Sequence, residues 1–485
     1  MNVKTEPAGS WRFTRKERRG LTMALCAILV FGTVLEFRTA LRRAPMTDLG
    51  VFACAAGAVR SGDNIYNISD WHGWHYQYPP ALAILFTPLA HPQPAPITLL
   101  PPGVPRTAAN TPWGYYIDAH SQYYGLHGEN RRFFGIVAVW YVISVGLIIF
   151  SAHALACVLE GSTLKTPPPS AVGERRRWWW LRTLPLLVCA GSLATDLSRG
   201  QVDVLMLAAV AGGLYLISAQ REFTAGICLS FPATVKLFPP FLLLYPFWRR
   251  RWRMSAGIVG GLILTLAILP AATLGPKRTV ELYRNWVDVL AKPALGHGTD
   301  TSRAKELTGI NASDNQSLLA FFHNWKHYNL PPMERPPKAD PGERYAVYAV
   351  GVLLLLGVGV VSGIRRHDGP QDLLIIAGLL VGLAFVVSPI VHNYYYLVLL
   401  PLVAALLDRS LAEGATPAPD PKLRWVLVVF LVVDVLARLP PIGNHLRDIG
   451  LPLLSMVALM CAGAMVLLRK DVAPGVVANA SHPCH

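Results

Sequence analysis

Long apolar stretches alternate with short polar segments along the whole chain. A helix needs about 20 apolar residues to cross the hydrocarbon core of a bilayer. Two shorter stretches, Pro79–Ala90 and Leu184–Leu197, are either short spans or re-entrant elements packed inside the protein. The stretches that reach or approach a full span are Leu21–Leu41, Phe133–Leu159, Val202–Ala219, Phe223–Trp248, Met254–Leu274, Tyr345–Ile364, Asp372–Val387, Tyr394–Leu407, Leu423–Leu439 and Leu451–Leu468. The pattern predicts an all-α, polytopic integral membrane protein with about 10–12 transmembrane helices.

Composition agrees with this prediction. Of the 485 residues, 53% are hydrophobic and only 15% are charged, which lies outside the usual range for soluble globular proteins. The net charge of +15 resides in short clusters beside apolar stretches, such as Arg249–Arg253, as is typical of cytoplasmic loops. No groove-reading module accompanies this charge, so nucleic acid is not an expected partner. The seven scattered cysteines form no Cys-x-x-Cys pair, which argues against a disulfide framework.

Basic clusters near both ends predict cytoplasmic termini and therefore an even number of crossings. A ten-span topology places Arg175–Arg177 inside, whereas a twelve-span topology places it outside. Both place three segments on the extracytoplasmic side: the loop 42–80, the long loop 275–341 and the corner Pro389–Asn393. We expect a cytoplasmic N-terminus (1–20), a transmembrane domain (21–470) with an irregular Pro-rich insertion (91–130), and a cytoplasmic tail (471–485).

Asp48 opens the first extracytoplasmic loop and precedes LGVFACAAGAVRSG, whose small and apolar residues recur at helical spacing. We expect an amphipathic helix along the membrane surface with Asp48 near its N-terminus. The carboxylate can cap that helix, and it can also act as a base. His72 and His75 lie later in the loop, but no carboxylate completes a metal set with them, so they are interpreted as residues of the lipid–water boundary.

Charged side chains also interrupt the apolar stretches, where they are costly and usually mark a functional path or a buried partner. The stretch SLATDLSRGQVDVLML contains Asp196, Arg199, Gln201 and Asp203, and Lys236 lies in FPATVKLFPPFLLL. Lys236 can be an ion-paired lysine, or it can be a cation that meets a lipid phosphate.

Two polar motifs lie in the remaining extracytoplasmic segments. Asp314-Asn315-Gln316-Ser317 leads into an apolar helix as an ordinary N-cap sequence. His392 stands in SPIVHNYYY, where it can serve as acid or base or as a phosphate donor, or can simply pack against the tyrosines. The sequence contains no Walker loop, Rossmann glycine pattern or nucleophile elbow, so it gives no support for ATP-driven transport, dinucleotide chemistry or hydrolysis.

The ordered motifs TDLGVFACAAGAVRSGDNIYN, YQYPPALAILFTPLA, RGQVDVLML, TAGICLSFPATVKLFPPFLLLYPFWRRRWR, DNQSLLAFF and SPIVHNYYYLVLLPL run from Thr47 to Leu402. Together they resemble glycosyltransferase family 87, the polyprenyl-phosphate-mannose-dependent mannosyltransferase-like enzymes of the GT-C fold. The chain departs from the family pattern in its insertion between Ala90 and Arg131. It departs again after the Asn-Gln-Ser helix start, where family members often carry an arginine and this chain has Phe322-His323-Asn324. Either His323 takes the place of that arginine, or the contact that the arginine makes is missing.

The resemblance implies an inverting transfer of a hexosyl residue, expected to be mannose, from a polyprenyl-phosphate donor to a lipid-linked or glycan acceptor. It implies a multi-pass protein of the cell (inner) membrane with an extracytoplasmic active site and no cofactor or divalent metal. Asp48 is the expected general base and His392 a second catalytic residue. The expected substrate-binding residues are Lys236, Arg199, Gln201, Tyr78, Asn315, Gln316 and His323. The alternatives are a transporter or flippase of lipid-linked sugars, which binds without chemistry, and a degenerate member that acts as a scaffold.

Overall fold

The computed structural model of the chain describes residues 13–42, 47–68, 74–90, 129–236, 240–294, 309–332, 334–364, 369–411 and 420–469. The tail 471–485 and nearly all of the predicted insertion 91–130 lie outside these residues. Helices dominate the described chain, as predicted for an all-α membrane protein, and an isolated antiparallel bridge joins Asn315 to His392.

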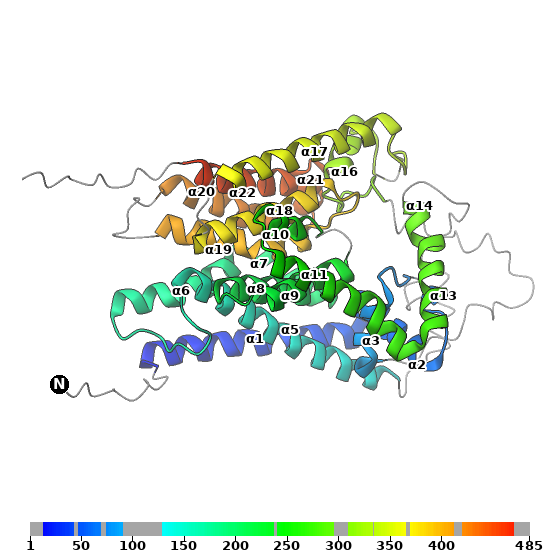
Figure 1. Cartoon of the computed structure of the whole chain (residues 1–485), viewed down its shortest axis with the longest axis horizontal. Coiled ribbons are helices and arrows are strands. Elements are labelled where there is room, and N and C mark those ends of the chain that lie inside the picture. Colours follow the sequence, from blue (N-terminus) through cyan, green and yellow to red (C-terminus); the bar gives the residue numbers. More distant parts are fainter. Residues whose placement is uncertain are drawn as a thin grey trace, which may run out of the picture.

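The helices run roughly along one direction, with several short ones crossing an end of the bundle (Figure 1). Their bounds are α1 Arg15–Arg42, α2 Thr47–Ser61, α3 Pro80–Leu85, α5 Glu129–Glu160, α6 Val172–Val188, α7 Ala190–Arg199, α8 Asp203–Ser218, α9 Glu222–Val235, α10 Leu244–Trp248, α11 Trp252–Ile263, α12 Leu269–Leu274, α13 Pro276–Trp286, α14 Lys292–Ala294, α16 Leu318–Lys326, α17 Pro341–Ile364, α18 Pro370–Val387, α19 Leu400–Leu411, α20 Pro421–Leu436, α21 Ile442–Asp448 and α22 Leu451–Leu468.

Seven helical stretches in the described part are long and apolar enough to cross a membrane, and α8 is a shorter apolar helix. The seven are Arg15–Phe37, Phe134–Glu160, Trp252–Leu274, Pro341–Ser362, Pro370–Val387, Asn393–Leu411 and Leu451–Leu468. They differ in burial, since α18 is 83% buried and the span in α1 only 6%. Apolar side chains that no protein covers need lipid around them, so α1 faces the bilayer and α18 forms the core. The chain is therefore a multi-pass membrane protein.

Two predicted apolar elements take a different form. The stretch Phe223–Trp248 is not one helix, because α9 ends at Val235 and Lys236 is extended, with φ −126° and ψ 126°. Pro232 lies inside α9 and Pro240 begins the next short turn, and proline disfavours a continuing helix. The stretch Pro79–Ala90 forms only the six-residue α3 and a short turn, which is about 9 Å of helix and too short to cross.

The helix after Asp48 is also less amphipathic than predicted. α2 forms where expected, but every residue from Leu49 to Ala56 is buried. It is therefore a packed element of the protein rather than a half-exposed helix on the membrane surface. Asp48 is the second residue of α2 and lies in its first turn rather than at the preceding cap position.

Ion pairs show which helix ends lie together. Glu17, at the start of α1, pairs with Arg175 at the start of α6. Arg177 pairs with Asp408 near the end of α19, at 2.7 Å. The basic clusters of α1 and α6 therefore share one end of the bundle, and α2, α3, α13, α14 and α16 lie toward the other (Figure 1).

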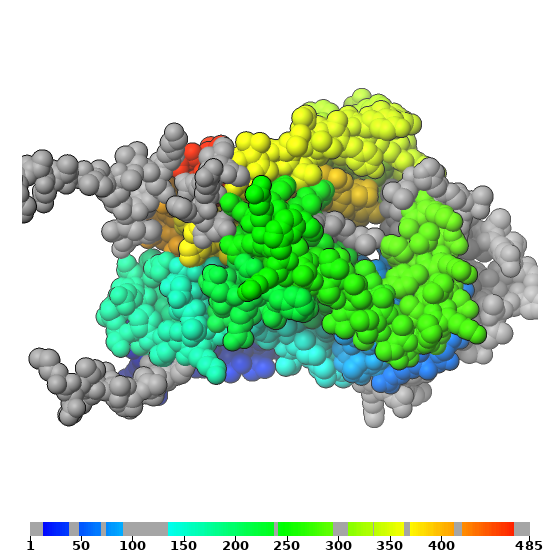
Figure 2. Space-filling model, in the orientation of Figure 1, coloured from blue at the N-terminus to red at the C-terminus, as the bar shows by residue number. Residues whose placement is uncertain are grey.

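α9 and α11 pack with their backbones in close contact. A Cβ added at Gly226 would overlap the Met254 carbonyl, and one added at Gly257 would overlap the Phe223 carbonyl. Small residues permit such close approach between membrane helices. The segment from α10 to α11, shown in green, covers the middle of the face in Figure 2, with α17 in yellow along its upper edge and α13 at the right-hand end. The close contact between α9 and α11 holds α9, and hence Lys236 just after its end, against the rest of the bundle.

Gly257→Ala is therefore expected to destabilise the protein, because the new methyl group meets backbone that cannot rotate away. Overpacking of this kind costs about 1–3 kcal/mol. Gly260→Ala on the same helix is the matched control, since its Cβ would lie 3.9 Å from the nearest atom, on the Phe223 ring. Thermal unfolding of the purified proteins in detergent measures the difference. Equal midpoints for the two variants would contradict the close helix contact.

Candidate active site

A cavity of about 350 Å³ lies at the end of the bundle that carries α2 and α13. Its walls come from segments far apart in the sequence: α2, the segment 74–79, the α7–α8 junction, the end of α9, the end of α13 with the residues after it, the segment before α16 and the corner before α19. The lining residues that bear charge or donate hydrogen bonds are Asp48, Trp74, His75, Gln77, Tyr78, Arg199, Gln201, Lys236, Trp286, Asp314, His392, Tyr394 and Tyr395.

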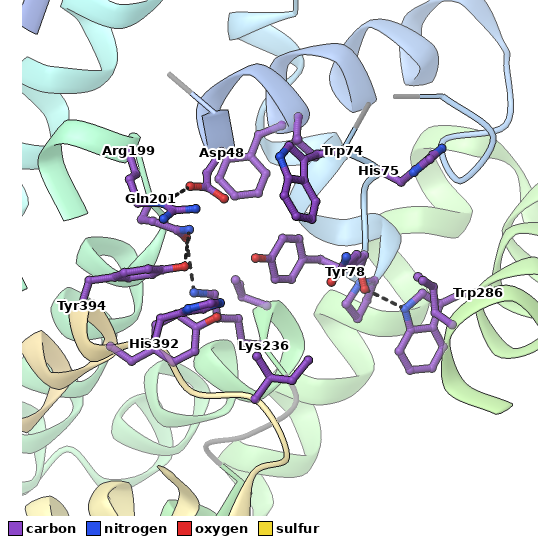
Figure 3. A pocket seen from close by; sticks show the side chains of 18 of the residues that line it. Asp48, Trp74, His75, Tyr78, Arg199, Gln201, Lys236, Trp286, His392 and Tyr394 are labelled. Atoms are coloured by element: carbon purple, nitrogen blue, oxygen red, sulfur yellow. Dashed lines mark hydrogen bonds and ion pairs between the residues drawn. The ribbon is translucent and has the colours of Figure 1, made fainter. Parts of the chain in front are cut away.

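Asp48 lies beside Arg199 in the lining of the cavity (Figure 3). The Arg199 Nε donates to Asp48 Oδ2 at 2.8 Å, and the guanidinium carbon lies 5.1 Å from the centre of the Tyr394 ring. Arg199 is the last residue of α7, which ends there because Gly200 takes a left-handed φ of 66°. Glycine adopts this conformation without steric cost. The turn at Gly200 thus sends Arg199 toward Asp48 and Gln201 into the cavity.

Lys236 forms the floor of the cavity. Its Nζ donates to Asp203 Oδ1 at 2.6 Å and to Gln201 Oε1 at 3.3 Å, and it lies 3.9 Å from the centre of the Tyr395 ring. Gln201 in turn donates from Nε2 to the Tyr394 hydroxyl at 3.0 Å. Asp203 is fully buried at the start of α8. Lys236 is therefore an ion-paired lysine, which was one of the two interpretations of the sequence, and at the same time it lines the cavity.

A second carboxylate lies buried close to this pair. Asp196 is 1% exposed, and both of its oxygens lack a hydrogen-bond partner among the described residues. One oxygen of Asp203, Oδ2, is likewise without such a partner within the described chain. Burial and the nearby Asp203 raise the pKa of Asp196 well above its usual range, so this carboxyl keeps its proton. The charge of Lys236 is therefore balanced by Asp203 rather than by two carboxylates.

His392 lies on the wall next to Asp314. Its ring stacks parallel on Tyr394, with centroids 5.2 Å apart, and its Nδ1 lies 3.6 Å from Asp314 Oδ2. Enclosure lowers the pKa of His392 below its usual range; Asp314 opposes this, while Arg199 and Lys236 add to it. The imidazole is therefore neutral at pH 7, with one nitrogen available to accept a proton.

The corner that carries His392 is held by the polar motif before α16. Asn315 Oδ1 accepts from the backbone nitrogens of Val391 and Ser317, and its Nδ2 donates to the Pro389 carbonyl at 3.1 Å. Ser317 caps α16 as predicted, since its hydroxyl accepts from Ala320 N at 3.1 Å. These hydrogen bonds explain why the corner keeps an irregular shape after Pro389.

The predicted site residues thus divide into two groups. Asp48, Tyr78, Arg199, Gln201, Lys236 and His392 line one cavity. Asn315, Gln316 and His323 do not belong to its lining. Gln316 donates to the Arg447 and Ser313 carbonyls, and His323 contacts Glu343 and the Pro336 carbonyl. These three residues hold backbone segments in place rather than facing the cavity.

Aromatic side chains complete the cavity, and most of them are not among the site residues predicted from the sequence. The Tyr78 hydroxyl points to the centre, with Trp74 above it and Trp286 beyond it (Figure 3). Burial raises the pKa of Tyr78, so its phenol stays protonated and can donate a hydrogen bond. The sequence placed His75 at the lipid boundary, whereas the structure places it in the lining; His72 lies outside the described residues. Only the density of aromatic residues in WHGWHYQY could have indicated this wall.

The arrangement can move a proton and stabilise an anion within one space. Asp48 and His392 can accept protons, and Lys236, Arg199 and Tyr78 can donate hydrogen bonds to a developing negative charge. Flat aromatic faces suit the apolar face of a sugar ring. Among the described residues, the group of three with metal-ligand spacing, His323, His327 and Glu343, includes no residue of the cavity lining.

A family model described as glycosyltransferase family 87 matches residues 131–389. The matched region contains Arg199, Gln201 and Lys236; it begins after Asp48 and ends three residues before His392. No curated protein and no solved structure gives a significant match to the chain.

Proposed function

Because the chain belongs to glycosyltransferase family 87, and so is a membrane glycosyltransferase, we propose that it transfers a mannosyl residue from a polyprenyl-phosphate donor to a glycan or lipid acceptor. The observation that carries the proposal is the meeting of Asp48, Arg199 and Lys236 in one cavity. A transfer needs a base for the acceptor hydroxyl and positive charge for the leaving phosphate. These three side chains supply both.

The reaction is a single displacement with inversion. The acceptor oxygen attacks the anomeric carbon, and its bond to that carbon forms as the bond from the carbon to the phosphate oxygen breaks. The hydroxyl proton goes to Asp48, and the bonding electron pair leaves with the polyprenyl phosphate. Lys236 and the Tyr78 hydroxyl stabilise the charge that develops on the phosphate.

The ion pair between Asp48 and Arg199 gives the donor a second role. Oδ2 of Asp48 is occupied by the Arg199 Nε at 2.8 Å. Arginine binds phosphate through a planar, bidentate set of N–H groups. The phosphate of the sugar donor therefore competes with the Asp48 carboxylate for the guanidinium. When Arg199 turns to the phosphate, the Asp48 oxygen is released to accept the acceptor proton. Donor binding would thus activate the base.

The basic clusters support an extracytoplasmic site for the reaction. The clusters at the starts of α1 and α6 share one end of the bundle, joined by the pair between Glu17 and Arg175. Clusters of this kind mark the cytoplasmic side. α1 has 28 residues, about 42 Å of helix, and Asp48 follows its far end. We therefore place the cavity on the extracytoplasmic side of the cell membrane, where a lipid-linked donor replaces nucleotide sugars.

The experiment incubates purified protein in detergent with radiolabelled polyprenyl-phosphate mannose and candidate lipid and glycan acceptors. The expected result is label in the acceptor together with an equal amount of free polyprenyl phosphate. A parallel reaction with a nucleotide-linked mannose should give no product. Transfer from the nucleotide sugar alone would overturn the choice of donor, and movement of intact donor across proteoliposomes without transfer would favour the flippase alternative.

A further inference from the structure

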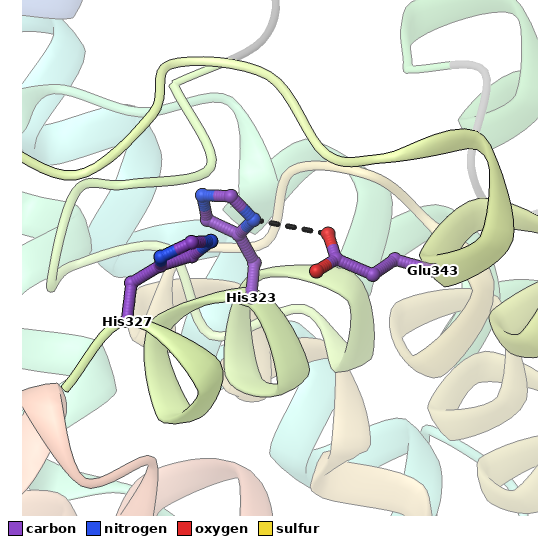
Figure 4. A group of neighbouring side chains, drawn as sticks. All are labelled: His323, His327 and Glu343. Atoms are coloured by element: carbon purple, nitrogen blue, oxygen red, sulfur yellow. Dashed lines mark hydrogen bonds and ion pairs between the residues drawn. The ribbon is translucent and has the colours of Figure 1, made fainter.

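Two histidines and a glutamate meet between α16 and α17 (Figure 4). His323 and His327 are four residues apart and so lie on one helical face, with ring centroids 4.7 Å apart. Glu343 lies in the first turn of α17 and reaches toward them. A nitrogen from each ring and a carboxylate oxygen all lie within 4.8 Å of one another.

The hydrogen bonds of His323 indicate a cation at this place. Its Nε2 lies 2.8 Å from the Pro336 carbonyl oxygen, which can only accept, so Nε2 carries a hydrogen. Its Nδ1 lies 3.0 Å from Glu343 Oε2, another acceptor. In the neutral ring Nδ1 would then hold a lone pair that faces a carboxylate, which is unfavourable. Either a proton or a metal ion must lie between them.

The surroundings match those of a metal ligand. A ligating histidine usually donates its other ring nitrogen to a backbone carbonyl or a carboxylate, which fixes the tautomer. His323 does this toward Pro336. Ligating carboxylates are themselves hydrogen-bonded. Glu343 accepts from Asp340 N at 3.1 Å on Oε2 and from Lys326 Nζ at 3.0 Å on Oε1.

We propose that His323, His327 and Glu343 bind a divalent transition metal ion of the zinc class. Two histidines and one glutamate are a zinc ligand set, with a fourth position open to water. Tetrahedral bonds of about 2.0–2.1 Å separate ligand atoms by about 3.3 Å. The pair Nδ1 and Oε2 is already near this separation, and rotation of the half-buried His327 brings in the third ligand.

The ion would tie α16 to α17 and thereby support the cavity. α16 begins directly after the motif that holds the His392 corner, and its cap residue Ser317 also donates to the Pro389 carbonyl at 3.0 Å. Asp314, four residues before α16, lines the cavity. The ion therefore acts on the fold and on the corner, and it takes no part in the transfer itself.

The test is metal binding by the full-length protein, purified with a tag that contains no histidine and stripped with a chelator. Zinc is titrated against a chromophoric competitor, and cobalt(II) is used as a probe of tetrahedral geometry through its visible absorption. The tail contains His482, Cys484 and His485, which are themselves metal-binding residue types. The informative quantity is therefore the difference between wild type and variants.

His327→Gln and Glu343→Gln should each remove about one equivalent of zinc, or weaken its binding by at least roughly tenfold, and should abolish the tetrahedral cobalt spectrum. Zinc should also raise the thermal midpoint of the wild type and not of these variants. His445→Gln, at an exposed histidine on α21, is the matched control and should behave as wild type. Equal binding by wild type and both variants would overturn the proposal and leave a proton between His323 and Glu343.

Discussion

Asp48→Asn is expected to lower the rate of sugar transfer by about 10²–10⁴-fold, the usual contribution of a general base. Asparagine has nearly the same shape and keeps an oxygen that can accept from Arg199. It cannot take the acceptor proton. The protein should therefore fold as the wild type does, and the donor should still bind.

Single-turnover transfer from radiolabelled donor measures this effect, and a separate binding assay measures the donor dissociation constant. Asp63→Asn, at an exposed carboxylate just after α2, is the matched control and should transfer at the wild-type rate. Undiminished transfer by Asp48→Asn would remove Asp48 from the reaction and leave it as a partner of Arg199.

Lys236→Met is expected to have two separate effects. The first is on stability, because Asp203 stays fully buried after its 2.6 Å partner is removed. Removing one member of a buried ion pair typically costs about 3–5 kcal/mol. The second is on donor binding, because a hydrogen bond to a charged group contributes about 1.5–3 kcal/mol, or roughly a 10–100-fold change in the dissociation constant.

The double variant Lys236→Met with Asp203→Asn separates the two effects. Asparagine removes the unpaired charge, so the thermal midpoint should recover toward that of the wild type. Donor affinity should stay weak, because the cation that meets the phosphate is still absent. A double variant that binds donor as tightly as the wild type would show that Lys236 only balances Asp203.

The position of the charged residues in the sequence was a good guide to the cavity. Arg199 and Lys236 interrupt apolar stretches, where charge needs a reason, and both line the cavity. Asp48 follows the first long apolar stretch, and sidedness alone placed it with His392. Spacing could not predict the pairing of Asp48 with Arg199, which are 151 residues apart. It also could not predict the pairing of Lys236 with Asp203, because that depends on how the consecutive helices α8 and α9 pack.

Polar residues that hold the backbone look the same in sequence as polar residues that bind substrate. Asn315 and Gln316 were predicted to contact substrate, but their side chains bind the carbonyls and amides of neighbouring corners. The aromatic wall was hidden for the opposite reason. Tryptophan is typical of the membrane–water boundary, so the sequence alone does not assign Trp74 and Trp286 to a site. Only the fold brings them to the cavity.

The apolar pattern predicted the long helices of the bundle better than the points at which apolar stretches are interrupted. It identified α1, α5, α17, α18 and α22 as long apolar helices, because length and hydropathy suffice for that. It treated Phe223–Trp248 as one span, although α9 ends at Val235, between Pro232 and Pro240, and leaves Lys236 in an extended conformation. An apolar stretch with both a charge and prolines is better interpreted as a broken helix that lines a site.

The most direct test of the account is a structure of the protein with an unreactive analogue of a polyprenyl-phosphate sugar. The phosphate is expected between Lys236 and Arg199, with the ion pair between Arg199 and Asp48 opened. The anomeric carbon is expected to face Asp48, with room for one acceptor hydroxyl between them. A donor bound away from this cavity, or an Asp48 carboxylate too far from the anomeric carbon for one hydroxyl to bridge, would contradict the account.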